Sequence, residues 1–241
     1  MLLLFDIDGT LLLRAFVEHR RALAEAVREV FGVADPGPAA VRAAGRTDGE
    51  IVREICVLGG VDAARIGAGA ADFRAACARA YARLCPPDLR DRLAPDAVRV
   101  LGALAARPGM RLGLVTGNLE AIARIKLERA GLEACFEAGL GAFGSDAEDR
   151  SALPALARRR AGAPRAPYPR ERTVVIGDTP NDIACARADG VRAVAVATGP
   201  YAAGDLRAAD AVIAGLGELP ALLDGGAGLS PRARTPPTAP R

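Results

Sequence analysis

Short apolar runs and helical apolar repeats alternate along the chain, and their order predicts the fold class. Short apolar runs that end at polar or glycine positions are typical of strands buried on both faces of a parallel sheet. We predict such strands at residues 2–6, 111–115, 135–140, 173–177, 192–197 and 211–213. Apolar residues at helical spacing predict helices at 95–106, 119–130, 151–161 and 180–188. The alternation of strands and helices indicates an α/β fold with a Rossmann-like parallel sheet.

The region between the first two predicted strands has a different pattern. Residues 15–93 show no strand alternation. Helical spacing predicts helices there at 15–31, 48–58 and 69–85. A segment of this length is too long for a single crossover between two parallel strands. We therefore expect an α/β core formed by residues 1–14 and 94–224, with residues 15–93 inserted as an all-helical cap domain.

Charge and composition narrow the functional classes. The net charge is +3, and residues 225–241 hold three arginines and no acidic residue, which leaves 29 basic and 29 acidic residues in the rest of the chain. A neutral body has no basic surface for nucleic acid, so we expect no nucleic-acid partner. The tail itself is rich in Gly, Pro, Arg and Thr without periodicity, and we predict that it is disordered.

Apolar runs and cysteines bear on location. No apolar run approaches the length that spans a membrane, so we expect no membrane partner. The five cysteines are scattered, odd in number and without metal-ligand spacing, which favours reduced packing residues of a cytoplasmic protein. The pattern leaves the oligomeric state open.

Two carboxylates follow the first predicted strand. Asp6 and Asp8 are two residues apart and precede Gly9. Residues two apart in a strand face the same side, and a turn at Gly9 lets both carboxylates converge on one small ligand. Two like charges this close repel unless a cation or a shared proton compensates, so a divalent metal with a phosphate is one explanation. Acidic residues that only cap a strand end are the other.

Polar residues also follow the second and fourth predicted strands. Thr116, Gly117 and Asn118 come after the second, and Asp178 and Asp182 come after the fourth. Ligands of an open parallel sheet bind beyond the carboxyl ends of its strands, so we expect the three strand ends to meet at one site. The Thr116 hydroxyl and the N–H groups of Gly117 and Asn118 suit an anion at a helix N-terminus. A plain strand-to-helix turn capped by Thr116 is the alternative.

The ordered set of motifs resembles the haloacid dehalogenase-like hydrolase superfamily. The motifs are FDIDGT at 5–10, VTGN at 115–118, Arg150 and GDTPND at 177–182. They follow the family's order and spacing, and the resemblance covers residues 1 to about 215. Within the superfamily the chain looks like the phosphoglycolate-phosphatase-like branch, which carries a helical cap after the first motif.

The resemblance implies a role for each acidic residue. Asp6 matches the nucleophile that forms an aspartyl-phosphate. Asp8 matches the general acid and base, and its presence favours phosphate esters, because dehalogenases of the superfamily lack it. Asp178 matches a metal ligand, joined by one Asp6 oxygen and the backbone carbonyl of Asp8, and this all-oxygen set indicates Mg²⁺. Asp182 lies one helical turn after Asp178, and we expect it to act through a metal-bound water, with an exposed helix carboxylate as the alternative.

A cation should offset the charge of the transferred phosphoryl group. The family usually has Lys in this position, and here Arg150 lies in the matching interval and can bind phosphate through two N–H groups. Lys126 is the competitor, but its place within a predicted helix favours a solvated or structural role. The run 158–160 of three arginines is expected to form a solvated helix face.

Three further polar residues lie in the predicted cap. Arg46 and Thr47 follow Gly45 at the start of a predicted helix, and the resemblance implies that this segment faces the site and contacts the substrate. An ordinary helix cap is the alternative. His19 is the only histidine, and we expect it to have no functional role.

The sequence therefore predicts a Mg²⁺-dependent phosphomonoester hydrolase. Its substrate would be a small phosphorylated metabolite such as 2-phosphoglycolate, a sugar phosphate or a nucleotide. A phosphosugar mutase is an alternative, because it shares the first chemical step. A non-catalytic phosphate-binding regulatory protein is another.

Overall fold

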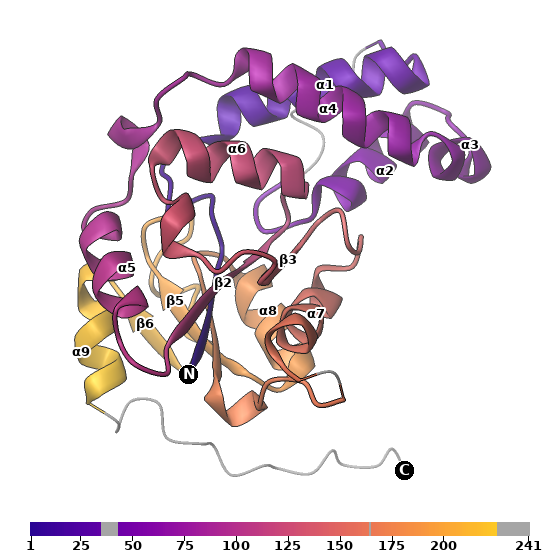
Figure 1. Cartoon of the computed structure of the whole chain (residues 1–241). Helices are drawn as coiled ribbons and strands as arrows, with labels where there is room; N and C mark the ends of the chain where they lie inside the picture. The colour runs from indigo at the N-terminus through magenta and orange to yellow at the C-terminus, as the bar shows by residue number, and fades with distance from the viewer. Residues whose placement is uncertain (35–42, 164, 226–241) are drawn as a thin grey trace, which may run out of the picture.

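A six-stranded parallel sheet forms the centre of the computed structural model, which describes residues 1–34, 43–163 and 165–225 (Figure 1). Its strands are β1 (Leu2–Phe5), β2 (Arg111–Thr116), β3 (Gly141–Phe143), β4 (Thr173–Gly177), β5 (Arg192–Val196) and β6 (Ala211–Ile213). They lie in the order β3-β2-β1-β4-β5-β6, and every neighbouring pair is parallel. The α/β fold with a parallel sheet is confirmed.

The helices follow the predicted order with small shifts at their ends. Between β1 and β2 lie α1 (Phe16–Phe31), α2 (Asp48–Leu58), α3 (Ala63–Ala68), α4 (Ala70–Leu84) and α5 (Ala97–Ala105). The later helices are α6 (Glu120–Ala130), α7 (Leu153–Ala161), α8 (Pro180–Asp189) and α9 (Leu219–Asp224). Helices α3 and α9 were not predicted, because six residues are too few to show a helical repeat.

Helices cover the sheet on both faces, and β1 alternates between the two apolar clusters that result. Leu3 and Phe5 pack into the cluster that contains residues of α5 and α6. Leu2 and Leu4 pack into the cluster that contains residues of α7 and α8. Because successive strand residues point to opposite faces, an uninterrupted apolar run is what a strand covered on both sides requires.

Helices α1 to α4 gather at the top of the molecule, beyond the end of the sheet toward which β1 runs (Figure 1). Helices α1 and α4 pack along each other, with Phe31 of one stacked on Phe73 of the other. We call residues 15–93 the helical segment; its standing as a separate cap domain stays a prediction. The prediction of a disordered tail falls, apart from Gly225, outside the described residues.

Two predicted details are wrong. The strand predicted at 135–140 begins at Gly141, because residues 133–135 form a 3₁₀ turn and the N–H of Leu140 bonds back to Glu137. The arginine run 158–160 is not a solvated face throughout. Arg158 is buried and forms two hydrogen bonds, of 2.6 and 2.8 Å, with the buried Asp189.

No helix within the described ranges is both long and apolar enough to cross a bilayer. The five cysteines are free, and four of them are buried.

Candidate active site

The three polar strand ends lie side by side. Strands β2 and β4 flank β1, so the residues that follow them converge at the carboxyl edge of the sheet. The N–H of Asp6 bonds to the carbonyl of Ile176 in β4 at 2.8 Å, which extends the pairing of the two strands into the site. This is the arrangement that the positions of Asp6, Thr116 and Asp178 at three strand ends predict.

Three buried carboxylates form one cluster. Asp6, Asp178 and Asp182 each place a carboxylate oxygen within 4.8 Å of the others. Burial raises the pKa of Asp6 to about 7, an effect that Arg150 opposes and the nearby carboxylates strengthen. Burial, together with the charges of Asp6 and Asp182, raises the pKa of Asp178 to about 8. Buried carboxylates at this spacing repel one another unless protons or a cation compensate, and an all-oxygen donor set fits a hard divalent cation such as Mg²⁺.

Asp178 is held between bare backbone segments. Gly9 has a φ of 86°, and a Cβ on Gly9 or on Gly199 would overlap the Asp178 carboxylate. The Thr10 hydroxyl donates a hydrogen bond of 3.0 Å to Asp178 Oδ1. Neither Thr10 nor Gly199 was predicted from the sequence as a site residue: Thr10 lies within the first motif, whereas no sequence signal marks Gly199.

Asp182 is fixed by the start of α8. Thr179 caps the helix, and its N–H and hydroxyl donate to Asp182 Oδ2 at 2.9 and 2.7 Å. The other oxygen, Oδ1, accepts a hydrogen bond from Arg150. Asp182 is 2% exposed, so the alternative of an exposed helix carboxylate is wrong.

Arg150 pairs with two of the three clustered carboxylates, Asp6 and Asp182. It begins the 3₁₀ turn Arg150–Ala152 that leads into α7. Its Nη2 lies 3.1 Å from Asp6 Oδ1 and also pairs with Asp182. Its Nε is buried and finds no hydrogen-bond partner among the described residues. An orphaned buried donor beside a nucleophile candidate is suited to an anion.

Of the two roles predicted for Lys126, solvated or structural, the solvated one is wrong. Lys126 is fully buried, and its Nζ lies 2.7 and 2.5 Å from the two carboxylate oxygens of Asp8. The reason lies in the register of α6, which buries Ile122, Lys126 and Ala130 along one face. This i, i+4 repeat was the available signal, and the apolar neighbours of Lys126 in sequence obscured it.

Asp8 differs from the clustered carboxylates. Burial alone would raise the pKa of Asp8, but the charge of Lys126 and hydrogen bonds from Lys126 and Asn118 bring it below its ordinary value. The Asp8 carboxylate does not belong to the cluster of Asp6, Asp178 and Asp182, so the Asp8 side chain is not a candidate metal ligand. The expected ligand atom, the backbone carbonyl of Asp8, stays a prediction.

The residues that follow β2 form hydrogen bonds with other site residues and with the helical segment. Asn118 donates to Asp8 Oδ2 at 2.9 Å and to the Thr116 hydroxyl at 3.1 Å. The carbonyl of Gly117 accepts from the N–H of Asp48 at 2.8 Å. Asp48 Oδ2 in turn accepts from the N–H of Leu119 at 2.7 Å, so one N–H at the start of α6 is occupied by a carboxylate of this chain.

The predicted substrate contacts of the helical segment stay predictions. Thr47 is fully buried, caps α2 and donates to the carbonyl of Glu148 at 2.5 Å, which is the helix-cap alternative. Arg46 pairs with Glu50 and Glu54. It nevertheless lines a cavity of about 280 Å³ that Arg150 also lines.

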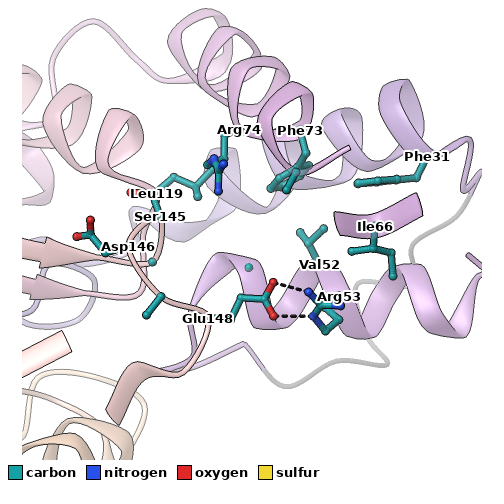
Figure 2. Close-up of a pocket in the computed structure, with 14 residues that line it drawn as sticks. Phe31, Val52, Arg53, Ile66, Phe73, Arg74, Leu119, Ser145, Asp146 and Glu148 are labelled. Carbon is teal, nitrogen blue, oxygen red and sulfur yellow. Dashed lines mark hydrogen bonds and ion pairs between the residues drawn. The ribbon is translucent and has the colours of Figure 1, made fainter. Parts of the chain in front are cut away.

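A second cavity, of about 190 Å³, separates the helical segment from the loop that precedes Arg150 (Figure 2). Phe31 and Phe73 line its apolar side. At its other side Arg53 of α2 and Glu148 form two hydrogen bonds, of 2.5 and 2.7 Å, which tie the segment to the core.

Comparisons with known proteins agree with the motifs. The family model described as haloacid dehalogenase-like hydrolase matches residues 3–187. A phosphoglycolate phosphatase of Rhodospirillum rubrum is 32% identical over 203 residues, which cover 81% of this chain and 79% of the relative.

Solved structures share the fold. A protein described provisionally as a β-phosphoglucomutase, from Bacteroides vulgatus, matches with a TM-score of 0.66 at 21% identity, over 95% of this chain and 90% of its own. CbbY of Rhodobacter sphaeroides in complex with phosphate matches with a TM-score of 0.64 at 22% identity, over 90% of this chain and 95% of its own.

Proposed function

The chain belongs to the haloacid dehalogenase-like hydrolases, and from this premise we propose that it is a Mg²⁺-dependent phosphatase acting on a small phosphate monoester. The observation that carries the proposal is the meeting of three buried carboxylates with one buried arginine. Asp6, Asp178 and Asp182 supply negative oxygen ligands, and Arg150 adds a cation whose Nε lacks a partner among the described residues. Metal and arginine together can bind a dianionic phosphate.

Asp6 is the proposed nucleophile. One of its oxygens would bond to phosphorus as the bond from phosphorus to the ester oxygen breaks, which gives an aspartyl-phosphate that water then hydrolyses. Arg150, 3.1 Å from Asp6, would offset the charge of the transferred group. The Thr116 hydroxyl and the N–H groups of Gly117 and Asn118 would hold the other phosphate oxygens.

Asp8 is the proposed acid and base. It would give a proton to the departing ester oxygen and later take one from the attacking water. Lys126 and Asn118 bond to its carboxylate, and this favours the ionised form that the second step requires. A quarter of the Asp8 side chain is exposed, so it can reach a bound ester, whereas Asp6 is nearly buried.

Mg²⁺ fits the donor set. We propose that Asp6, Asp178 and the backbone carbonyl of Asp8 hold the ion, with Asp182 acting through a water molecule. When bound, Mg²⁺ would neutralise charge on the phosphate and orient it for in-line attack. The repulsion within the carboxylate cluster is the structural support for this cation.

The substrate class is a small phosphorylated metabolite. The Rhodospirillum rubrum relative is a phosphoglycolate phosphatase, which puts 2-phosphoglycolate first among the compounds to test. Arg46 of the helical segment would contact the part of the ester that leaves, and the buried Thr47 would hold the loop that carries Arg46. A cytoplasmic location and independence from nucleic acid and membranes belong to the same proposal.

The test is phosphate release from a panel of small esters, 2-phosphoglycolate included, with Mg²⁺ and with EDTA. We expect metal-dependent release from one or a few compounds, its loss in Asp6→Asn, and normal release in Asp72→Asn, which changes an exposed carboxylate. An isomeric phosphate ester in place of free phosphate would identify a mutase. Normal turnover by Asp6→Asn would refute the mechanism.

A further inference from the structure

We propose that Lys126 is a positioning residue that aims the Asp8 carboxylate, and that His19 and Asp48 of the helical segment hold Lys126 in place. The four residues form a hydrogen-bonded chain from Asp48 through His19 and Lys126 to Asp8. This inference rests on the proposed function, because the hydrogen-bonded chain is argued to position Asp8, the proposed acid and base.

The ammonium group of Lys126 has a partner for each of its three hydrogens. Its Nζ lies 2.5 Å from the nearer oxygen of Asp8, 2.6 Å from Asn118 Oδ1 and 3.2 Å from His19 Nδ1. A lysine donates three hydrogen bonds and accepts none, so these three acceptors satisfy it completely. Since Lys126 is fully buried, any rotation of its side chain would leave a buried charge without partners.

His19 transmits the position of the helical segment. Asp48 accepts at Oδ2, 3.0 Å from His19 Nε2, and Lys126 can only donate, to His19 Nδ1. The imidazole therefore carries its proton on Nε2 and accepts at Nδ1. Tyr81 of α4 lies against both residues, with its ring centre 5.7 Å from that of His19 and 5.8 Å from Lys126 Nζ.

Both ends of this hydrogen-bonded chain, Asp48 and Asp8, lie at the edge of the site. Asp48 also bonds to the backbone of Gly117 and Leu119, next to Asn118, which itself bonds to Asp8. Three helices of the helical segment thus reach Lys126: α1 through His19, α2 through Asp48 and α4 through Tyr81. A shift of the segment away from the strand ends would take His19 and Tyr81 away from Lys126, so the ammonium group that aims Asp8 would lose one of its three hydrogen-bond partners.

Arg158 shows what a purely structural ion pair looks like in this protein. It pairs with Asp189 at the far end of α8, both side chains are buried, and neither bonds to a candidate site residue. The Lys126 pair differs because its carboxylate is the partly exposed Asp8.

The expected consequence depends on the leaving group. An alkyl phosphate expels a strongly basic alkoxide that needs a proton, whereas 4-nitrophenyl phosphate expels a weakly basic phenolate that needs little help. General acid catalysis contributes roughly 10²- to 10⁴-fold, so misplacing Asp8 penalises the alkyl ester selectively. Hydrolysis of the aspartyl-phosphate is common to both esters, so the selective effect appears in kcat/KM, which reports the first step. For Lys126→Met we expect kcat/KM on the alkyl ester to fall about 10²-fold or more, and kcat/KM on 4-nitrophenyl phosphate to fall less than about 10-fold.

A second pair of variants keeps the test decisive if Lys126→Met fails to fold. His19→Asn retains an acceptor near Nδ1, and His19→Leu removes both hydrogen bonds. We expect the selective loss in His19→Leu and its partial rescue in His19→Asn. Arg158→Met is the matched control, because it breaks a buried ion pair and should lower thermal stability without favouring either ester.

Equal proportional losses of kcat/KM on both esters, or no loss in folded variants of Lys126 and His19, would overturn the inference while wild-type phosphatase activity stands. Absence of phosphate release from the wild type, or its persistence in Asp6→Asn, would overturn the proposed function and this inference with it.

Discussion

Gly117 lies where the helical segment touches the strand ends, and Gly117→Ala tests whether that contact is present in solution. A Cβ on Gly117 would lie 2.0 Å from the carbonyl oxygen of Arg46, a backbone atom that cannot rotate away. Ordinary contact begins at 3.4 Å, so the two loops must separate by about 1.4 Å. The substitution therefore adds one methyl group and forces the backbone to move.

The cost follows from the bonds at that point. The N–H of Asp48 donates to the carbonyl of Gly117 at 2.8 Å, and Asp48 accepts from Leu119 at 2.7 Å. Each such bond contributes about 1 kcal/mol net, and overpacking costs about 1–3 kcal/mol. Since the loops can relax in part, we expect the free energy of unfolding to fall by about 2–4 kcal/mol, which lowers Tm by roughly 4–16 °C for a chain of this size.

Thermal unfolding followed by circular dichroism measures this loss. Gly102→Ala is the control, because Gly102 is exposed in α5 and a Cβ there meets nothing within 4 Å. Alanine in a helix interior should stabilise that variant by about 0.5–1 kcal/mol. If Gly117→Ala unfolds at the wild-type temperature, the contact between Arg46 and Gly117 is not populated, and the coupling of the helical segment to Asp8 loses its basis.

The remaining predictions concern the carboxylate cluster. Burial raises the pKa of Asp6 to about 7 and of Asp178 to about 8, so the metal-free folded protein binds more protons than the unfolded chain, and its stability should fall as pH rises from about 4 to 8. Mg²⁺ must displace these protons at about pH 5 but not at about pH 8.5. The Tm measured with Mg²⁺ should therefore exceed the Tm measured with EDTA by more at the higher pH. Equal differences at the two pH values would argue against a carboxylate metal site. Arg150→Met should lower kcat/KM by roughly 10²- to 10³-fold. Arg150→Lys should lose less of kcat/KM, because lysine keeps the positive charge although it can pair with only one of the two carboxylates at a time. Equal losses for the two variants in steady-state kinetics would show that the positive charge is not the property that supports catalysis.

The sheet and most helices were predictable because their signals are local. An apolar run such as residues 2–5 and a helical repeat such as residues 16–31 are complete within their own segments. Strand β3 was misplaced because it has only three residues, and its position depends on pairing with Leu114 and its neighbours, which lie far away in sequence. Pairing of this kind leaves no periodic trace in the short strand itself.

The carboxylates and Arg150 could be found because each follows a recognisable motif or interval. The hydrogen-bonded chain from Asp48 to Asp8 could not, because its four members come from four separate parts of the sequence and meet only in the folded protein. A single histidine at position 19 carries no signal by itself. The buried face of α6 was the one readable sign, since residues 122, 126 and 130 share it.

The bare backbone around Asp178 has a practical consequence for mutagenesis. The Asp178 carboxylate fits between Gly9 and Gly199 because neither residue has a side chain, and a Cβ at either position would overlap it. Alanine scanning detects residues by deleting side-chain atoms, so at these positions it adds a group instead, and the result is easily mistaken for a folding defect. A map of this site drawn only from truncations would therefore omit part of its wall, and insertion of volume at glycines is the complementary experiment.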